Sequence, residues 1–285
     1  MDVVINAAFD IISFGSIIVL VVLGLGIIAS MMGIFNFAHA EFILLGAYTV
    51  YMFHRSGLPV WLGMLAAPVL VALFGLLLER SIIQWFYAAP VVAMLGTYAI
   101  GVVIRELVRG LIGGLYHNVP EPVIGFITVG DVSVSKWRAL IIVITAGVIA
   151  ASYLLLTRTR LGLCIRAALE NPALARASGI STGCIYAITF SFGAALAGLA
   201  GALMVPLFSL FPDLGMRFLI QGFLAVMVGG IGTFEGPVVG AGVVGVITAA
   251  FPWFLNPVLA DVLVFVVAII IVKLKPAGLL SQQRG

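Results

Sequence analysis

Charged residues are scarce in this chain of 285 residues: only 9% are Asp, Glu, Lys or Arg, whereas 63% are hydrophobic. An average soluble domain has roughly 25% charged residues. A helix needs about 20 mostly apolar residues to cross a bilayer, and several uncharged windows reach that length. The composition therefore excludes a soluble globular protein, a disordered chain and a nucleic-acid-binding protein, and it indicates a polytopic membrane protein. The uncharged windows are 11–40, 56–78, 81–104, 139–157, 177–212, 218–234 and 236–260.

The apolar runs also lack the period-two alternation of an outer-membrane barrel. Ile17 to Ile28 and Val262 to Val272 are continuous runs, and in lipid such runs must pair their backbone groups internally, as helices do. The N-terminus has Asp2 and Asp10 where a signal peptide has basic residues, so we expect the first run to remain as a span.

Motifs for catalysis, metal binding and nucleotide binding are missing. The three histidines lie on different segments, the two cysteines fit no metal or redox spacing, and no H-E-x-x-H or G-x-x-x-x-G-K-[ST] occurs. The glycine run Gly229 to Gly236 has no nearby Lys and is flanked by apolar segments. We therefore expect no catalytic residues, no metal ligands and no ATP site in this chain.

The sequence predicts an all-α fold, a polytopic membrane helical bundle that forms one domain over 1–285. The seventh of its eight or nine spans is short and is bounded by glycines, and the last contains Asp261. Glycines in such positions are typical of broken helices. The predicted spans are 12–33, 37–53, 58–79, 91–109, 138–157, 183–206, 217–233, 237–253 and 256–273.

Basic residues gather in the loop 158–182 and in the C-terminal tail. Because Lys and Arg favour cytoplasmic loops, we place both segments in the cytoplasm. Counting back through the spans places the N-terminus and the polar loop 110–137 in the periplasm. Prolines on both sides of Glu121 exclude a regular helix there, so we expect an ordered loop or short hairpin.

Two groups of polar residues are candidates for a translocation path. Asn36 and His39 share a face if this segment is helical, with Glu41 pointing elsewhere. Ionisable groups at membrane depth are costly and are often functional, although this segment also fits a polar turn between two spans. Arg105 and Arg109 lie one turn apart; they line the mouth of a path or snorkel towards the interface.

Small residues suggest close helix contacts and a helix break. Gly193, Ala197 and Gly201 recur every four residues, with Gly198 on the adjacent stripe, so we expect another helix to pack closely on that side. The run Gly229 to Gly236 fits either a broken helix where substrate passes or simple tight packing. It also parallels 33–37, which hints at an internal repeat.

The loop 158–182 contains a helix start at Asn171-Pro172 and a helix stop at Gly179. These signals predict a two-turn helix over about 172–178. Its alanines provide too weak an apolar face for a helix lying on lipid. A helix that docks in a groove of another protein fits better.

The sequence resembles the integral permeases of branched-chain amino-acid-type ABC importers. The resemblance covers about residues 12–275 and keeps the family's motif order. It rests on three motifs: Asn36-Phe37-Ala38-His39-Ala40-Glu41-Phe42 with Gly46-Ala47-Tyr48; Arg166-Ala167…Asn171-Pro172…Ala175…Gly179-Ile180; and Gly229-Gly230-Ile231-Gly232-Thr233…Gly236-Pro237…Gly240-Ala241.

The resemblance implies a permease subunit of the bacterial inner membrane, surrounded by lipid. Its implied partners are a second homologous permease, two cytoplasmic ATPase subunits that bind ATP and Mg, and a periplasmic substrate-binding protein. The implied ATPase-coupling residues are Arg166, Ala168, Glu170, Asn171, Pro172, Ala175, Arg176 and Gly179. The translocation-path candidates are Asn36, His39, Glu41, Thr97, Arg105, Gly230, Thr233 and Glu235.

The resemblance implies that the solute is a branched-chain or hydrophobic amino acid, or a related small solute such as urea or a short amide. Arg105, Glu106 and Arg109 stand where many amino-acid members have uncharged polar residues, and members similar to urea or amide importers often have an Arg there. The competing hypothesis is a stand-alone secondary transporter or channel, with Glu41, Glu235 and Asp261 as candidate ion-binding acids.

Overall fold

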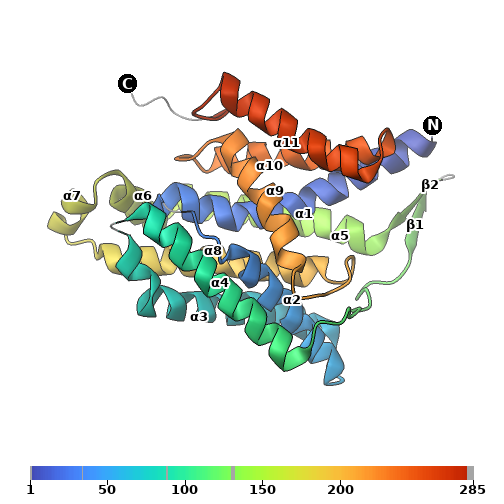
Figure 1. The fold of residues 1–285 in the computed structure, drawn as a ribbon, viewed down its shortest axis with the longest axis horizontal. Coiled ribbons are helices and arrows are strands. Elements are labelled where there is room, and N and C mark those ends of the chain that lie inside the picture. The colour runs from blue at the N-terminus through green and yellow to red at the C-terminus, as the bar shows by residue number, and fades with distance from the viewer. Residues whose placement is uncertain (1, 34, 88, 130–131, 281–285) are drawn as a thin grey trace.

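The computed structural model describes residues 2–33, 35–87, 89–129 and 132–280 and forms a nearly all-α bundle (Figure 1). The prediction of a helical membrane bundle is confirmed. The elements are α1 (Asp2–Met32), α2 (His39–Arg55), α3 (Val60–Ser81), η1 (Ile83–Phe86), α4 (Pro90–Ile112), β1 (Phe126–Val129), β2 (Val132–Ser135), α5 (Lys136–Arg158), α6 (Arg160–Glu170), α7 (Pro172–Ala177), α8 (Thr182–Met204), α9 (Leu214–Gly229), α10 (Glu235–Ala250), η2 (Phe251–Trp253) and α11 (Pro257–Leu274).

Six helices within the described ranges are long and apolar enough to cross a membrane: α1, α3, α4, α5, α8 and α10 with η2. The predicted spans 37–53, 217–233 and 256–273 correspond to α2, α9 and α11, with 17, 16 and 18 residues. The structure extends the first span: α1 begins at Asp2 and has 31 residues, or about 46 Å at 1.5 Å per residue. A bilayer core is about 30 Å thick, so α1 protrudes beyond it.

Two helices form the centre of the bundle. In the most apolar 18-residue stretch of α1 and of α8, 72% is buried inside the bundle. The buried share of the same stretch is 28% in α3 and α4 and 22% in α5. The outer helices expose large apolar side chains such as Leu65, Leu77 and Val143. Such a surface suits lipid or another apolar partner.

The two ends of the bundle differ (Figure 1). One end, called here the α7 end, holds α6 and α7. The other, called the hairpin end, holds the start of α1 and the antiparallel pair β1–β2. This pair lies within the loop 110–137, where the sequence predicts an ordered loop or short hairpin.

Small residues of α8 contact three helices, whereas the sequence predicted close approach on one side. A Cβ at Gly193 would lie 2.6 Å from Cγ1 of Ile28 in α1, and one at Gly198 would lie 2.7 Å from Cβ of Val71 in α3. A Cβ at Gly201 would overlap the carbonyl oxygen of Ile43 in α2. Ala197, between them, is fully buried. The small residues of α8 therefore allow close packing of α1, α2 and α3 around it.

Gly201→Ala is expected to lower the free energy of unfolding by about 1–3 kcal/mol, because α2 and α8 must move apart to admit the methyl group. Thermal melting of the purified protein measures the effect. Gly242→Ala in α10 is the control, since a Cβ there meets no described atom within 4 Å. Equal melting temperatures for the two variants would contradict the packing argument.

Candidate translocation and coupling sites

The turn between α1 and α2 contains two fully buried residues, Asn36 and Ala38. Asn36 is fully buried, and its Oδ1 accepts a hydrogen bond from the Ala38 N–H at 3.0 Å. Since α2 begins only at His39, Asn36 precedes the helix. The expected shared helix face of Asn36 and His39 is therefore wrong: a side-chain bond to the backbone two residues ahead favours a turn over a helix.

His39 fixes the start of α2 against the middle of α1. Its ring is fully buried, and Nε2 donates to the carbonyl oxygen of Val21 at 3.0 Å. A Cβ at Gly24, on the next turn of α1, would lie 3.0 Å from Cε1 of His39. The imidazole thus fits against a glycine and holds α2 in place.

Helix α4 contacts this turn through Thr97 and contacts the start of α2 through Arg105. The Phe37 N–H donates to Oγ1 of Thr97 at 3.1 Å. Arg105 donates to Oε1 of Glu41 from Nη2 at 2.7 Å and from Nε at 3.1 Å. The side chain of Glu41 is only 1% exposed and that of Arg105 15%. Arg105 therefore turns inward to a buried carboxylate, and this contact replaces the snorkelling interpretation.

The ion pair continues into a chain of charges. Nη1 of Arg105 is 3.5 Å from Oδ1 of Asp213, and Nη2 of Arg109 is 2.9 Å from Oδ2 of the same residue. Arg109 also pairs with Glu106 at 2.7 Å. Asp213 is not among the residues predicted from the sequence, although it is the only acidic residue between 171 and 234. Charges from α2, α4 and the start of α9 are thus brought together.

A second interruption between apolar helices, after the α1–α2 turn, is the break between α9 and α10. Helix α9 ends at Gly229, and Gly230 and Gly232 have φ of +97° and +103°, which glycine adopts without strain. Ser30 at the end of α1 accepts from the Gly232 N–H and donates to the Thr233 carbonyl oxygen, both at 3.3 Å. The break therefore lies beside the α1–α2 turn, and each copy of the suspected repeat gives helix, break and helix.

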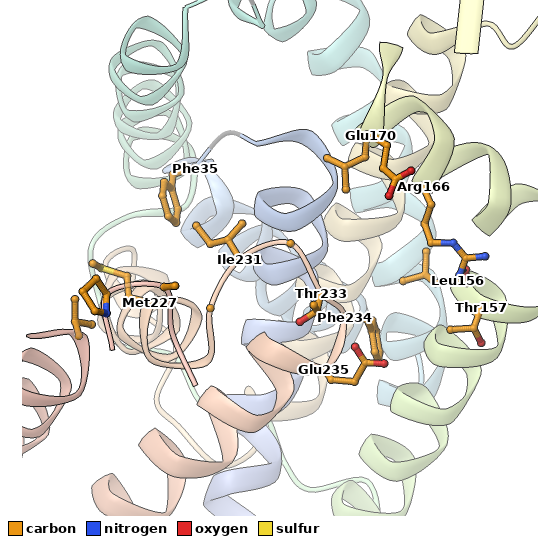
Figure 2. Close-up of a pocket in the computed structure, with 16 residues that line it drawn as sticks. Phe35, Leu156, Thr157, Arg166, Glu170, Met227, Ile231, Thr233, Phe234 and Glu235 are labelled. Atoms are coloured by element: carbon orange, nitrogen blue, oxygen red, sulfur yellow. The ribbon is translucent and has the colours of Figure 1, made fainter. Parts of the chain in front are cut away.

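A cavity of about 820 Å³ connects this break to α6. Figure 2 shows Arg166 and Glu170 of α6 around the same space as Thr233 and Glu235. Arg166 also donates to the Leu156 carbonyl oxygen at 3.0 Å. The eight path candidates thus fall into two groups. Gly230, Thr233 and Glu235 line this cavity; Asn36, His39, Glu41, Thr97 and Arg105 surround the start of α2.

The predicted helix over 172–178 is present as α7. Oδ1 of Asn171 accepts from the Leu174 N–H at 2.9 Å, and Gly179 has φ of +83° after the last turn. Leu174 is 63% exposed, whereas Ala175 is buried. The preceding α6 is a second helix of this loop, and the sequence did not predict it as a separate helix. Together α6 and α7 form the outermost part of their end of the bundle (Figure 1).

Comparisons with known proteins agree with this arrangement. Residues 7–272 match the family model described as "Branched-chain amino acid transport system / permease component". The permease LivH of Salmonella typhimurium is 26% identical over 96% of this chain and 94% of its own length. BraD of Pseudomonas aeruginosa is 26% identical over 94% and 92%, respectively. A probable LivH of Methanocaldococcus jannaschii is 26% identical over 85% and 79%.

LivH and BraD are high-affinity branched-chain amino acid transport system permease proteins. The family match covers both breaks, the chain of charges from Glu41 to Glu106 and the α6–α7 segment. The chain therefore belongs to the family of permease components of branched-chain amino acid transport systems.

Proposed function

We propose that this chain is the permease subunit of a binding-protein-dependent ABC importer in the bacterial inner membrane. It forms the path for a branched-chain or hydrophobic amino acid, or a related small solute such as urea or a short amide. Its partners are a second homologous permease, two ATPase subunits that hold ATP and Mg, and a periplasmic binding protein. The family match and the names of the relatives support this function.

The exposed, capped helix α7 is the observation that carries the proposal. Leu174 projects from it at 63% exposure, and a lone apolar side chain on a short capped helix suits a groove in a partner. The α7 end then faces the cytoplasm, and the hairpin end and N-terminus face the periplasm. The coupling residues are Arg166, Ala168, Glu170, Asn171, Pro172, Ala175, Arg176 and Gly179.

The 820 Å³ cavity supports a route for the motion. Arg166 and Glu170 lie on α6, directly before α7, and line the same space as Thr233 and Glu235 of the break. A displacement of α7 by the ATPase is thereby transmitted through α6 to the break between α9 and α10. Free helix ends at such breaks suit a substrate path.

Leu174→Asp is expected to abolish recovery of the ATPase with the tagged chain, because an apolar contact becomes a buried charge. The measurement is purification from native membranes in mild detergent, followed by identification of the bound proteins. Leu115→Asp is the matched control: Leu115 is 76% exposed and follows α4, away from α7. Equal ATPase recovery with both variants would contradict docking through α7.

Recovery of the wild-type chain alone, folded and stable, would instead favour a secondary transporter. That alternative needs a free acidic site for a coupling ion. Glu41 is already paired with Arg105 at 2.7 Å, which disfavours it as such a site.

A further inference from the structure

The chain after α11 returns to the end of α9. The Leu279 N–H donates to the carbonyl oxygen of Val228 at 2.9 Å. The Leu280 N–H donates at 3.1 Å to the carbonyl oxygen of Gly229, the last residue of α9. The last carbonyl groups of a helix have no partner within that helix. Residues 275–280, called here the C-terminal strap, therefore cap α9 from the far end of the sequence.

The C-terminal strap also contacts the glycine at which α9 gives way to the break. A Cβ at Gly278 would overlap the Cα of Gly230, so this approach requires glycine in the strap. The φ angles are +91° at Gly278 and +97° at Gly230, and glycine adopts both without strain. A Cβ at Gly236 in α10 would lie 2.6 Å from the carbonyl oxygen of Gly230. Gly230 is therefore held between the strap and the start of α10.

The C-terminal strap and α6 line the same cavity. Pro276 and Ala277 of the strap lie along the cavity of about 820 Å³ beside the break. Arg166 and Glu170 of α6 line it as well. A displacement of α6 that changes the shape of this cavity therefore changes the space available to the strap. The route proposed above, from α7 through α6, thus reaches the strap as well as the break.

The C-terminal strap buries few of its side chains. Lys275, Pro276, Ala277 and Leu280 are exposed, and Leu279 is partly buried. Segments with few buried apolar contacts open locally at a low cost in free energy. The strap can therefore leave α9 while the central helices α1 and α8 stay packed.

We propose that the C-terminal strap is a reversible latch on the break between α9 and α10. While the strap caps α9, the break keeps the conformation described above. The strap leaves α9 when ATP-driven motion of α7 and α6 reshapes the cavity, because such a motion acts differently on the capped and uncapped states. The inference rests on the proposed importer function for the ATP cycle and adds a regulatory element outside α6 and α7.

Hydrogen–deuterium exchange on the purified wild-type importer tests the release of the strap. The amides of Leu279 and Leu280 are bonded to α9, so the peptide that contains them should exchange slowly without nucleotide. Trapping of the ATPase subunits with ATP and vanadate should speed this exchange about tenfold. Equal exchange in the two states would overturn the proposal that the strap is released.

Gly278→Ala tests whether the strap holds the break. The new methyl group would overlap Gly230, and φ of +91° strains alanine, so the strap should leave α9. We expect faster exchange in the peptide covering 226–235. We also expect a severalfold rise in ATP hydrolysis without solute, because the break is no longer held in its resting conformation. A merely structural role of Gly278 would lower ATP hydrolysis instead.

Gly57→Ala is the matched control for backbone strain. Gly57 has φ of +75°, and a Cβ there meets no described atom within 4 Å, so this variant should keep the exchange and ATP hydrolysis of the wild type. A chain that ends at Lys275 removes the strap without strain and should behave as Gly278→Ala does. A chain that ends at Leu280 keeps the strap and should behave as the wild type. Wild-type exchange at 226–235 in the chain that ends at Lys275 would overturn the latch.

The outcomes separate the latch from the importer function. If the wild-type importer takes up solute and hydrolyses ATP, but its strap exchanges equally in both states, ATP-driven release fails and the importer function stands. If no ATPase accompanies the wild-type chain, the importer function fails and ATP-driven release fails with it. Exchange at 226–235 in Gly278→Ala and Gly57→Ala, measured on the purified chain alone, then decides whether the strap holds the break.

Discussion

Arg105→Ala is expected to lower the free energy of unfolding by about 3–5 kcal/mol, because it leaves the carboxylate of Glu41 buried without its partner. Glu41 is 1% exposed, so water cannot replace the guanidinium group. Thermal melting of the purified protein measures the loss. We also expect altered solute uptake. ATPase attachment should be unchanged, because the proposed docking helix α7 does not contact this ion pair.

Two further variants test the cause. Glu41→Gln in the Arg105→Ala background removes the unpaired charge and should restore much of the stability. Arg109→Ala, one turn along α4, should cost under about 1 kcal/mol, because Arg109 is 40% exposed and its acidic partners reach water. A similar loss for Arg105→Ala and Arg109→Ala would show that burial of Glu41 does not govern the effect.

Gly179→Val is expected to abolish uptake while the chain remains in the membrane. At φ of +83° a β-branched residue is strained, so the backbone after α7 must change and α7 loses its orientation towards the ATPase. A Cβ at this position meets no described atom within 4 Å, which excludes a packing clash as the cause. Solute uptake and solute-stimulated ATP hydrolysis by the reconstituted importer measure the effect.

Gly147→Val in α5 is the matched control. This exposed glycine also has open space around its Cβ, but it lies within a regular helix. The control should insert and transport as the wild type does. Normal uptake by Gly179→Val would show that this turn is not needed for coupling to the ATPase.

Local signals predicted the features that depend on neighbouring residues. Helix α7 was predictable from Asn171, Pro172 and Gly179, because a cap, a first-turn proline and a left-handed stop each act within one turn of helix. The glycines around Gly230 were compatible with either a helix break or tight packing, and the structure has the break. The start of α1 was placed ten residues late, because Asp2 and Asp10 end the apolar window whereas a helix can continue into water.

The charge chain could not be predicted from spacing. Glu41 and Arg105 are 64 residues apart, and Asp213 lies another 108 residues further on. Only packing of α4 on the α1–α2 turn brings them together, and no sequence period encodes that contact. The spacing of the glycines in α8 predicted a stripe of small residues. It did not predict which helix packs on each glycine, because that depends on how α1, α2 and α3 cross α8.

The partners of α1 give the chain a constraint during its synthesis. Gly24 lies against Gly193 of α8, and Gly26 lies against Pro237 of α10. The first helix to leave the ribosome therefore meets α8 only after roughly two thirds of the chain has been made, and α10 only after roughly four fifths. Until then we expect the face of α1 that packs on α8 and α10 to contact lipid or the insertion machinery, so truncated translation products that lack α8 should be degraded.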